Sequence, residues 1–258
     1  MKVKRGKVIT ITSSKGGIGK TVFATNLTGV FGYLKKKTLL IDLDLYAGGI
    51  GTFLNLSNTK TIYNLVDDIT NNRFKDVRDY VSKYDEYIDV MASPKDPRQG
   101  AKIDVNMIER IIETYKMHYD IVVVDTNHLT IPANLMALDL SDDILYLVSN
   151  DPIDLANTKS MMSIFHDTGK DNVKVILNES FSKDKGYFSN FDIKSVIKHN
   201  IDYILSSSMY IKNIDKYIME GKILTLNDNL KFNNNKDKEL FLSIANRLSE
   251  VNNEEESN

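Results

Sequence analysis

Residues 13–21, Ser-Ser-Lys-Gly-Gly-Ile-Gly-Lys-Thr, join an apolar segment at Lys7–Thr12 to an amphipathic segment at Lys20–Leu34. Glycines let this backbone curl so that several N–H groups face one anion, and the start of the following helix adds partial positive charge. Lys20 supplies a full positive charge to the β- and γ-phosphates of a nucleotide, and the Thr21 hydroxyl is a ligand for Mg²⁺. We therefore predict a phosphate-binding loop. Its nucleotide-binding residues are Gly16, Gly17, Ile18, Gly19, Lys20, Thr21 and Val22.

Short apolar, β-branched runs alternate with amphipathic segments along the rest of the chain. Nearly continuous hydrophobicity in such runs is typical of strands buried on both faces of a parallel sheet. The alternation predicts βαβ units, and hence a single-domain α/β fold with a mostly parallel, twisted sheet flanked by helices. The expected strands are Lys7–Thr12, Thr38–Asp42, Ile88–Met91, Ile121–Asp125, Ile144–Ser149 and Val173–Asn178. The expected helices are Lys20–Leu34, Val105–Lys116, Ile153–His166, Phe191–His199 and Glu239–Val251, with a loop at 227–237. Residues 56–86 give mixed helix and loop signals.

Composition excludes several kinds of site. The 258 residues include 33 basic and 35 acidic side chains, a net charge of −2, and no cysteine. Without cysteine there is no disulfide framework, thiol nucleophile, Cys-ligated zinc or iron–sulfur cluster. The four histidines, at positions 118, 128, 166 and 199, lack metal-ligand spacing. No signal peptide or membrane span is recognisable, so we expect a cytoplasmic protein.

Two carboxylate groups are expected beside the loop. Asp42-Leu43-Asp44 follows the second strand, and Asp125 ends the run Ile-Val-Val-Val-Asp. Ligands of parallel α/β folds bind beyond the carboxyl ends of the strands, so these side chains should face the phosphates. A strand that simply ends in a polar turn is the alternative for the first pair. Asn150-Asp151-Pro152 also ends a strand, and it either shapes the same pocket or caps the helix that follows.

The stretch Lys-Gly-Gly-x-Gly-Lys-Thr at 15–21 resembles the deviant Walker A motif of the ParA/MinD superfamily, which are P-loop ATPases. The resemblance implies ATP and Mg²⁺ as cofactors and one ATPase domain over residues 1–251, before a disordered acidic tail at 252–258. It also implies that Lys15 reaches across a dimer interface to the partner's nucleotide, where it would act on the phosphoryl charge as an arginine finger does. A solvated loop edge at Ser14-Lys15 is the alternative. Ser14 itself departs from the general motif, which has glycine there.

The same resemblance assigns roles to the remaining residues. Lys15, Lys20 and Asp44 become catalytic, with Asp44 orienting the attacking water. Thr21, Asp42 and Asp125 would surround the metal, and the amide of Asn178 would contact the adenine edge. Relatives often continue after the Asp125 position with a proline-containing turn, whereas this chain reads Thr126-Asn127-His128.

Composition also selects among branches of the superfamily. The absence of cysteine excludes the metallocluster carriers, and the last tyrosine, Tyr217, lies too early for a tyrosine-rich kinase tail. MinD-like members end in a basic amphipathic membrane helix, whereas residues 239–258 hold five acidic side chains and one basic side chain, Arg247. An anionic bilayer would repel such a tail, so direct membrane anchoring is not expected.

The remaining branches are TadZ/CpaE-like pilus or secretion assembly ATPases and ParA-type partition ATPases. Asp125–His128, Asn150–Lys159 and the region from Asp192 to Lys222 resemble the first. We therefore expect a slow, partner-stimulated ATPase that forms an ATP-dependent homodimer and positions a protein cargo, recruited to a pole or a membrane complex through partners. The alternatives are a partition ATPase that binds nonspecific DNA, a MinD-like cell-division or flagellar positioning ATPase, and a non-hydrolysing scaffold held together by nucleotide.

Overall fold

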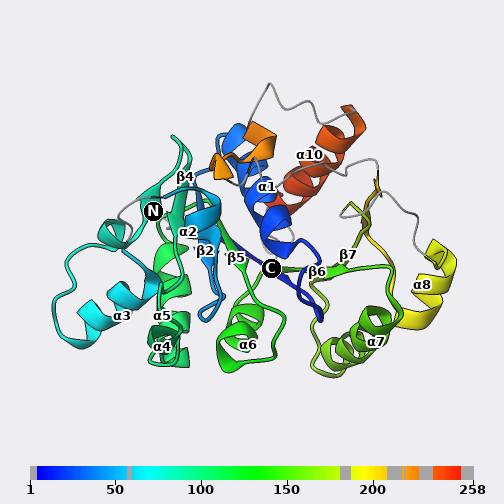
Figure 1. The fold of residues 1–258 in the computed structure, drawn as a ribbon, viewed down its shortest axis with the longest axis horizontal. Helices are drawn as coiled ribbons and strands as arrows, with labels where there is room; N and C mark the ends of the chain where they lie inside the picture. The colour runs from blue at the N-terminus through cyan, green and yellow to red at the C-terminus, as the bar shows by residue number, and fades with distance from the viewer. Residues whose placement is uncertain are drawn as a thin grey trace, which may run out of the picture.

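A single sheet with strand order β3-β4-β2-β5-β1-β6-β7-β8 forms the centre of the computed structural model (Figure 1). The structure describes residues 5–56, 60–180, 187–207, 217, 219–226 and 235–250. All of the strand pairs are parallel except β3 with β4. The strands are β1 (Lys7–Thr12), β2 (Thr38–Asp42), β3 (Ser82–Lys83), β4 (Ile88–Met91), β5 (Ile121–Asp125), β6 (Asp143–Val148), β7 (Val173–Asn178) and β8 (Tyr203–Leu205).

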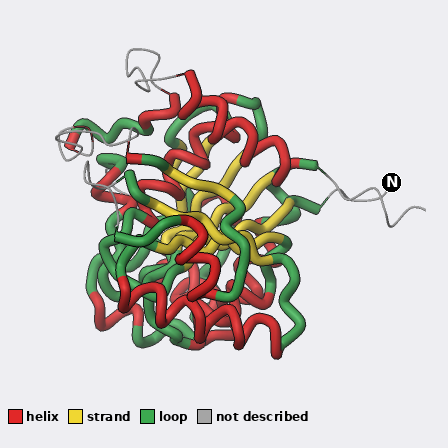
Figure 2. Tube along the Cα trace, turned by 90° about the vertical axis from the view of Figure 1, so that its right-hand side faces the viewer, coloured by secondary structure: helices red, strands yellow, loops and turns green. Residues whose placement is uncertain are grey.

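Helices cover both faces of this sheet, which lies between them in Figure 2. On one face, α1 (Lys20–Tyr33), α2 (Ile50–Phe53), the 3₁₀ turn η3 (Leu224–Leu226) and α10 (Asn235–Ser249) pack in one apolar cluster with the sheet. On the other face lie α3 (Ile62–Thr70), η1 (Val77–Tyr80), α4 (Pro97–Gly100), α5 (Val105–Tyr115), α6 (Pro132–Asp139), α7 (Pro152–Asp167) and α8 (Asn190–Ile197). Successive residues of the strands alternate between the cluster on one face and the two clusters on the other, as a pleated sheet requires.

The register of the central strands brings the predicted site together. In β5, Asp125 pairs with Ile11 of β1 on one side and with Asp42 of β2 on the other. The carboxyl ends of β1, β2 and β5 therefore meet at one edge of the sheet. The loop that leaves β1 and the carboxylates of the other two strands are neighbours for this reason, as expected for a parallel α/β sheet.

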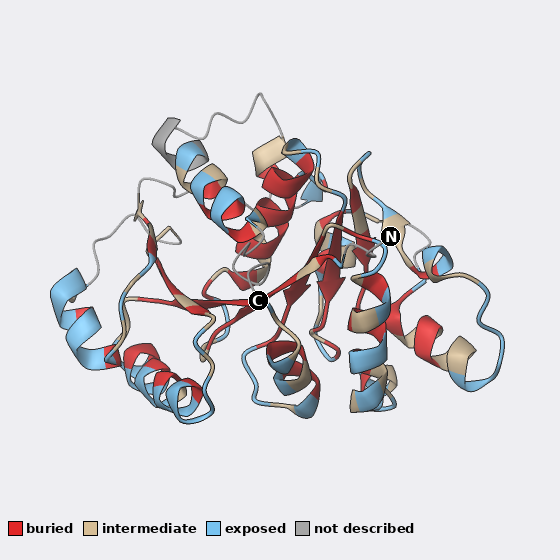
Figure 3. Ribbon diagram, turned by 180° about the vertical axis from the view of Figure 1, so that it is seen from behind, coloured by how far each residue is buried: buried red, intermediate tan, exposed pale blue. Residues whose placement is uncertain are grey.

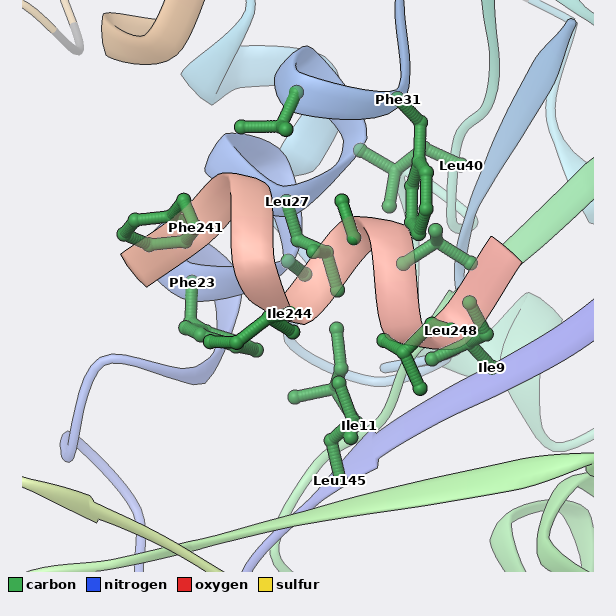
Figure 4. Packing of buried hydrophobic residues seen from close by; sticks show 14 of the residues in the cluster. Ile9, Ile11, Phe23, Leu27, Phe31, Leu40, Leu145, Phe241, Ile244 and Leu248 are labelled. Carbon is green, nitrogen blue, oxygen red and sulfur yellow. The ribbon is translucent and has the colours of Figure 1, made fainter. Parts of the chain in front are cut away.

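Helix α1 differs from the amphipathic helix predicted at Lys20–Leu34. It is buried almost all round because α10 and η3 cover the side that faces away from the sheet (Figure 3). In Figure 4, Phe241 and Ile244 of α10 lie beside Phe23 of α1, and Leu248 of α10 lies beside Ile9 of β1. Glycines inside α1 allow the turn at 223–226 to approach this helix closely. A Cβ atom at position 29 would lie 2.2 Å from Thr225 Oγ1 of the neighbouring turn.

The α/β fold with a mostly parallel sheet is confirmed, and the six predicted strands are present within one residue at their ends. Strand β6 begins at Asp143 rather than Ile144, because Asp143 already pairs with Ile9 of β1. The Asp143 carboxylate forms ion pairs with Lys7 Nζ at 2.7 Å and with Lys174. The predicted helices also form, with ends moved by a few residues. Strands β3 and β8 and helix α6 were not predicted. Within the uncertain region 56–86, the structure places α3, η1 and β3.

The prediction of a loop at 227–237 is wrong for its last part, because α10 begins at Asn235 and ends at Ser249. Lysine and glutamate are good helix formers, so the helix extends ahead of its apolar positions. Residues 227–234 and the predicted tail at 252–258 lie outside the described residues. In the part of the chain that is described, no helix has the length and hydrophobicity of a membrane span.

Candidate nucleotide-binding site

The phosphate loop closes onto the start of α1 through two glycines with left-handed backbone conformations. Gly17 has φ of 74° and Gly19, which caps α1, has φ of 88°. Glycine adopts this region without steric cost, which explains its presence at both positions. Gly16 and Gly17 are exposed, so their backbone faces solvent at the end of β1. The N–H groups at this helix start form the kind of cradle that binds anions.

Lys20 is the buried cation of the loop. Its Nζ donates to Ser13 Oγ at 2.8 Å and reaches the carbonyl oxygen of Lys15 at 3.4 Å. Burial lowers the pKa of Lys20, while the charges of Asp125 and Asp44 oppose that shift. Its hydrogen bonds go to neutral oxygens, and a buried ammonium without a charged partner is unfavourable. A phosphate in the loop would supply the missing negative charge.

Thr21 and Asp125 meet at the base of the loop. Thr21 Oγ1 donates to Asp125 Oδ2 at 2.6 Å, whereas Asp125 Oδ1 is buried and has no hydrogen-bond partner. Burial, together with the charge of the nearby Asp42, raises the pKa of Asp125 to about 7. An unpaired carboxylate oxygen beside a hydroxyl is a donor set that suits Mg²⁺, which prefers oxygen ligands. The residues present therefore fit the metal ion, and Thr21 and Asp125 are the side chains that would hold it.

The metal would need further oxygens from the nucleotide or from water. Among the described residues, no group of three or more His, Asp or Glu side chains forms a complete metal site. Mg²⁺ usually binds through one or two carboxylates together with substrate phosphates, so the small protein donor set agrees with a nucleotide-bound metal.

Asp42 is fully engaged with the protein. Its Oδ2 accepts hydrogen bonds from Ile50 N at 3.0 Å and Ser93 Oγ at 2.9 Å, and its Oδ1 accepts one from Asp44 N at 3.2 Å. Burial raises its pKa to about 6, which these hydrogen bonds limit. Asp42 thus ties the segment after β2 to the sheet. Its place near the metal remains a prediction.

Asp44 is half-buried at the same edge and linked to the segment after β5. Asp44 Oδ1 accepts from Ala47 N at 3.1 Å and from Asn127 Nδ2 at 3.4 Å. The other end of the Asn127 amide, Oδ1, accepts from Leu129 N and from Asn134 Nδ2 in α6. The unusual Thr126-Asn127 sequence therefore connects Asp44 to α6. His128 is exposed and lies beside Gly16. A Cβ atom added to Gly16 would lie 3.3 Å from His128 Nδ1.

Asn178 contacts the loop itself. Its Nδ2 donates to the carbonyl oxygen of Ile18 at 2.8 Å, and its Oδ1 accepts from Ser180 N and Oγ. Its amide is therefore at the nucleotide site, while its contact with adenine remains a prediction. Of the group 150–152, Asp151 is the helix cap: its Oδ1 accepts from the N–H groups of Ile153 and Asp154 in α7. Asn150 instead bonds both backbone groups of Phe188.

Two contacts between the loop and α7 escaped the sequence analysis. Lys15 Nζ lies 3.2 Å from Asp151 Oδ2, and Ser14 Oγ donates to Asp154 Oδ1 at 2.6 Å. The sequence offered Asn150-Asp151-Pro152 either as part of the same pocket or as the cap of α7, but it did not pair Asp151 or Asp154 with individual residues of the loop.

Comparison with known proteins identifies the family. The profile of the family described as "AAA domain" matches residues 6–172. Septum site-determining protein MinD of Bacillus subtilis is 30% identical over 122 residues, which cover 46% of this chain and 44% of MinD. Sporulation initiation inhibitor protein Soj of the same organism is 30% identical over 152 residues, 54% of this chain and 57% of Soj. The chain belongs to the ParA/MinD superfamily.

The fold agrees with this membership. The crystal structure of a ParA family ATPase from Chlorobium tepidum TLS superposes with a TM-score of 0.78 over 94% of this chain and 98% of that chain, at 16% identity. This likeness shows the fold, while the predicted superfamily is confirmed by the family profile together with the relatives MinD and Soj. The alignments with MinD and Soj span about half of each relative.

Proposed function

We propose that this protein is an ATP-dependent molecular switch that binds ATP with Mg²⁺, forms a homodimer in that state and hydrolyses ATP slowly. The observation that carries the proposal is the Thr21–Asp125 contact of 2.6 Å, with an unpartnered carboxylate oxygen beside the buried Lys20. A loop, a cation and a metal-binding pair are the parts that phosphoryl transfer requires.

Different residues of the chain would bind the phosphates, hold the metal ion and orient the attacking water. Lys20 would bind the phosphate oxygens, and the loop N–H groups would hold the phosphates in place. A bound Mg²⁺ would neutralise developing charge on the phosphoryl group. Asp44, half-buried and held by Asn127, would orient the attacking water. A single carboxylate is a weak base, so slow turnover in the absence of a stimulating partner is the expected behaviour.

Dimerisation would use Lys15. Its ammonium lies 3.2 Å from Asp151 Oδ2, and both side chains are partly exposed. A cation in this position is available to a nucleotide bound by a second copy of the chain, provided that the ion pair opens. Across the interface it would stabilise charge on the partner's γ-phosphate.

We further propose a protein assembly as the cargo, such as a pilus or secretion complex of the TadZ/CpaE kind. This rests on the resemblance of Asp125–His128 and Asn150–Lys159 to that branch. In this role the protein would reach a pole or membrane complex through partners. A MinD-like positioning role is the alternative that the relative MinD favours, and a nucleotide-held scaffold is the alternative if hydrolysis is absent.

DNA partition is a second candidate, favoured by the likeness to the ParA family ATPase and to Soj. Phosphate contacts release counterions, so such a protein would be retained on nonspecific DNA with ATP at low salt and released at high salt. No retention at low salt would exclude this candidate.

Phosphate release and sedimentation test the switch itself. Purified full-length chain should form dimers with ATP and Mg²⁺ but not with ADP, and should release phosphate at a low, measurable rate. The Lys15→Ala variant should bind ATP yet remain monomeric. A dimer that persists in Lys15→Ala would reject the role of Lys15 across the interface, and dimerisation without phosphate release would favour the scaffold.

A further inference from the structure

Asp154 is a fully buried carboxylate at the start of α7, with 0% of its surface exposed. Its Oδ2 accepts hydrogen bonds from Ser149 N and Ser149 Oγ, both at 2.7 Å. Its Oδ1 accepts from Ser14 Oγ at 2.6 Å. Among the described residues, no lysine or arginine forms an ion pair with it. Three short hydrogen bonds therefore stabilise the charge, and hydrogen bonds to an ionised group are stronger than those between neutral groups.

Ser14 occupies the position at which the general phosphate-loop pattern has its first glycine. The backbone of Ser14 does not have a positive φ, so glycine is not required there for conformational reasons. The serine, however, adds a side chain to a loop that must hold one shape around a phosphate. Asp154 accepts a hydrogen bond from that side chain and so connects the phosphate loop to α7, although the two residues are 140 positions apart in sequence.

We propose that Asp154 is a positioning residue for the phosphate loop: by holding Ser14, it pre-organises the loop for nucleotide and couples the loop to α7. The loop residues on either side of Ser14 carry the function. Ser13 accepts from Lys20 Nζ, and the carbonyl oxygen of Lys15 lies 3.4 Å from the same atom. A loop that is already ordered loses less conformational entropy when it binds a ligand, and therefore binds more tightly.

The inference rests on the proposed ATP binding and is tested by a double-mutant cycle on ATP affinity. We expect Ser14→Ala and Asp154→Ala each to raise the Kd for ATP about five- to tenfold, and the double variant to be no weaker than Asp154→Ala alone. The matched control is Ser149→Ala. It removes a hydrogen bond from the same carboxylate, but it leaves Ser14 bound and should leave the Kd unchanged.

A second cycle uses the glycine of the general pattern. In a Ser14→Gly background the loop no longer carries the side chain that Asp154 holds, so Asp154→Ala should then change the Kd less than twofold. Equal effects in both backgrounds would mean that Asp154 acts only through general stability, and the proposal would be wrong. Additive effects of Ser14→Ala and Asp154→Ala would also overturn it.

Hydrogen exchange of the nucleotide-free chain separates this inference from the proposed function. Peptides covering residues 13–21 should exchange at least about fivefold faster in Ser14→Ala than in the parent, with no such change in Ser149→Ala. If the parent chain does not bind ATP, the proposed function fails while this measurement still decides the coupling. Unchanged exchange in Ser14→Ala overturns the inference even if ATP binds, and Ser14→Ala keeps the test available should Asp154→Ala fail to fold.

Discussion

Lys15 Nζ lies 3.2 Å from Asp151 Oδ2, so the lysine proposed to act on a second subunit is paired within its own chain. Hydrogen bonds from the α7 backbone hold the pKa of Asp151 below its ordinary value, and the contact with Lys15 lowers it further. The pair is partly exposed, with 44% and 36% of the two side chains accessible, and is therefore weak enough to open. In the proposed dimer, Lys15 would exchange Asp151 for the partner's phosphate.

Asp151→Asn should make dimerisation easier. Asparagine caps a helix as well as aspartate does, so α7 should remain intact while the charge that holds Lys15 is lost. We expect the ATP concentration at half-maximal dimerisation to fall by up to about fivefold, the range of a surface ion pair. Sedimentation velocity across an ATP titration measures this. Asp167→Asn, near the other end of the same helix, is the control, and an equal shift in both variants would contradict the exchange.

The raised pKa values of Asp125 and Asp42 predict that the stability of the protein depends on pH. The pKa of Asp125 is raised to about 7 and that of Asp42 to about 6, both by burial first, against 3.8 for an ordinary aspartate. Between pH 4 and pH 7 the folded chain therefore holds protons that the unfolded chain has lost. The free energy of unfolding without nucleotide should consequently decrease as pH rises through this window, because the unfolded state binds fewer protons.

Asp125→Asn isolates this effect. An amide cannot titrate, so the loss of stability between pH 5 and pH 7 should shrink by roughly 1–2 kcal/mol relative to the parent. Urea unfolding at both pH values gives the comparison. Asp139→Asn, an exposed acid of α6, should leave the pH dependence as it is. A parent whose stability rises over this range, with Asp125→Asn unchanged, would show that the carboxylate ionises normally.

The length and the burial of each element explain which elements the sequence predicted and which it missed. The parallel strands were predictable because burial on both faces makes each of them a continuous apolar run, as in β5. Strands β3 and β8 contain two and three residues, too few for any pattern. Helix α6 buries small or polar residues such as Ala133, Asn134 and Ala137, so no apolar stripe marks it.

Some residues of the candidate site were likewise predictable from the sequence, whereas some of its contacts were not. Lys20, Thr21 and the strand-end carboxylates were predictable because spacing along the chain determines their positions relative to a strand and a helix. The links made by Asn127 and Asp154 were not, because each depends on a partner far away in sequence. Asn127 meets Asp44 across 83 residues, and Asp154 meets Ser14 across 140. Only the three-dimensional register brings them together.

The close packing of α1 predicts an unusual response to alanine. At an interior helix position, glycine to alanine normally stabilises by up to about 1 kcal/mol. In Gly29→Ala, however, the new Cβ would lie 2.2 Å from Thr225 Oγ1 and 2.4 Å from Ile223 Cγ2. It would also disturb the hydrogen bond from Thr225 Oγ1 to the carbonyl oxygen of Asn26, at 2.7 Å.

We therefore expect Gly29→Ala to destabilise the chain by about 1–3 kcal/mol, measured by urea unfolding. Gly49→Ala is the control, because nothing lies within 4 Å of its added Cβ and its φ of −136° suits alanine. A Gly29→Ala protein as stable as the parent would mean that the turn at 224–226 does not pack against α1 in solution.

Asp44 and Asn127 predict a graded loss of hydrolysis. Asp44→Ala removes the carboxylate proposed to orient water, so it should bind ATP normally and release phosphate at least about 100-fold more slowly. Asn127→Ala removes only the amide that holds Asp44, at 3.4 Å, and should lower kcat about three- to tenfold with KM unchanged. In the Asp44→Ala background, Asn127→Ala should have no further effect, because the carboxylate that it holds is absent.

Steady-state phosphate release with the single and double variants measures all three effects. Turnover by Asp44→Ala equal to that of the parent would remove Asp44 from the chemistry, and an additive double variant would mean that Asn127 acts elsewhere.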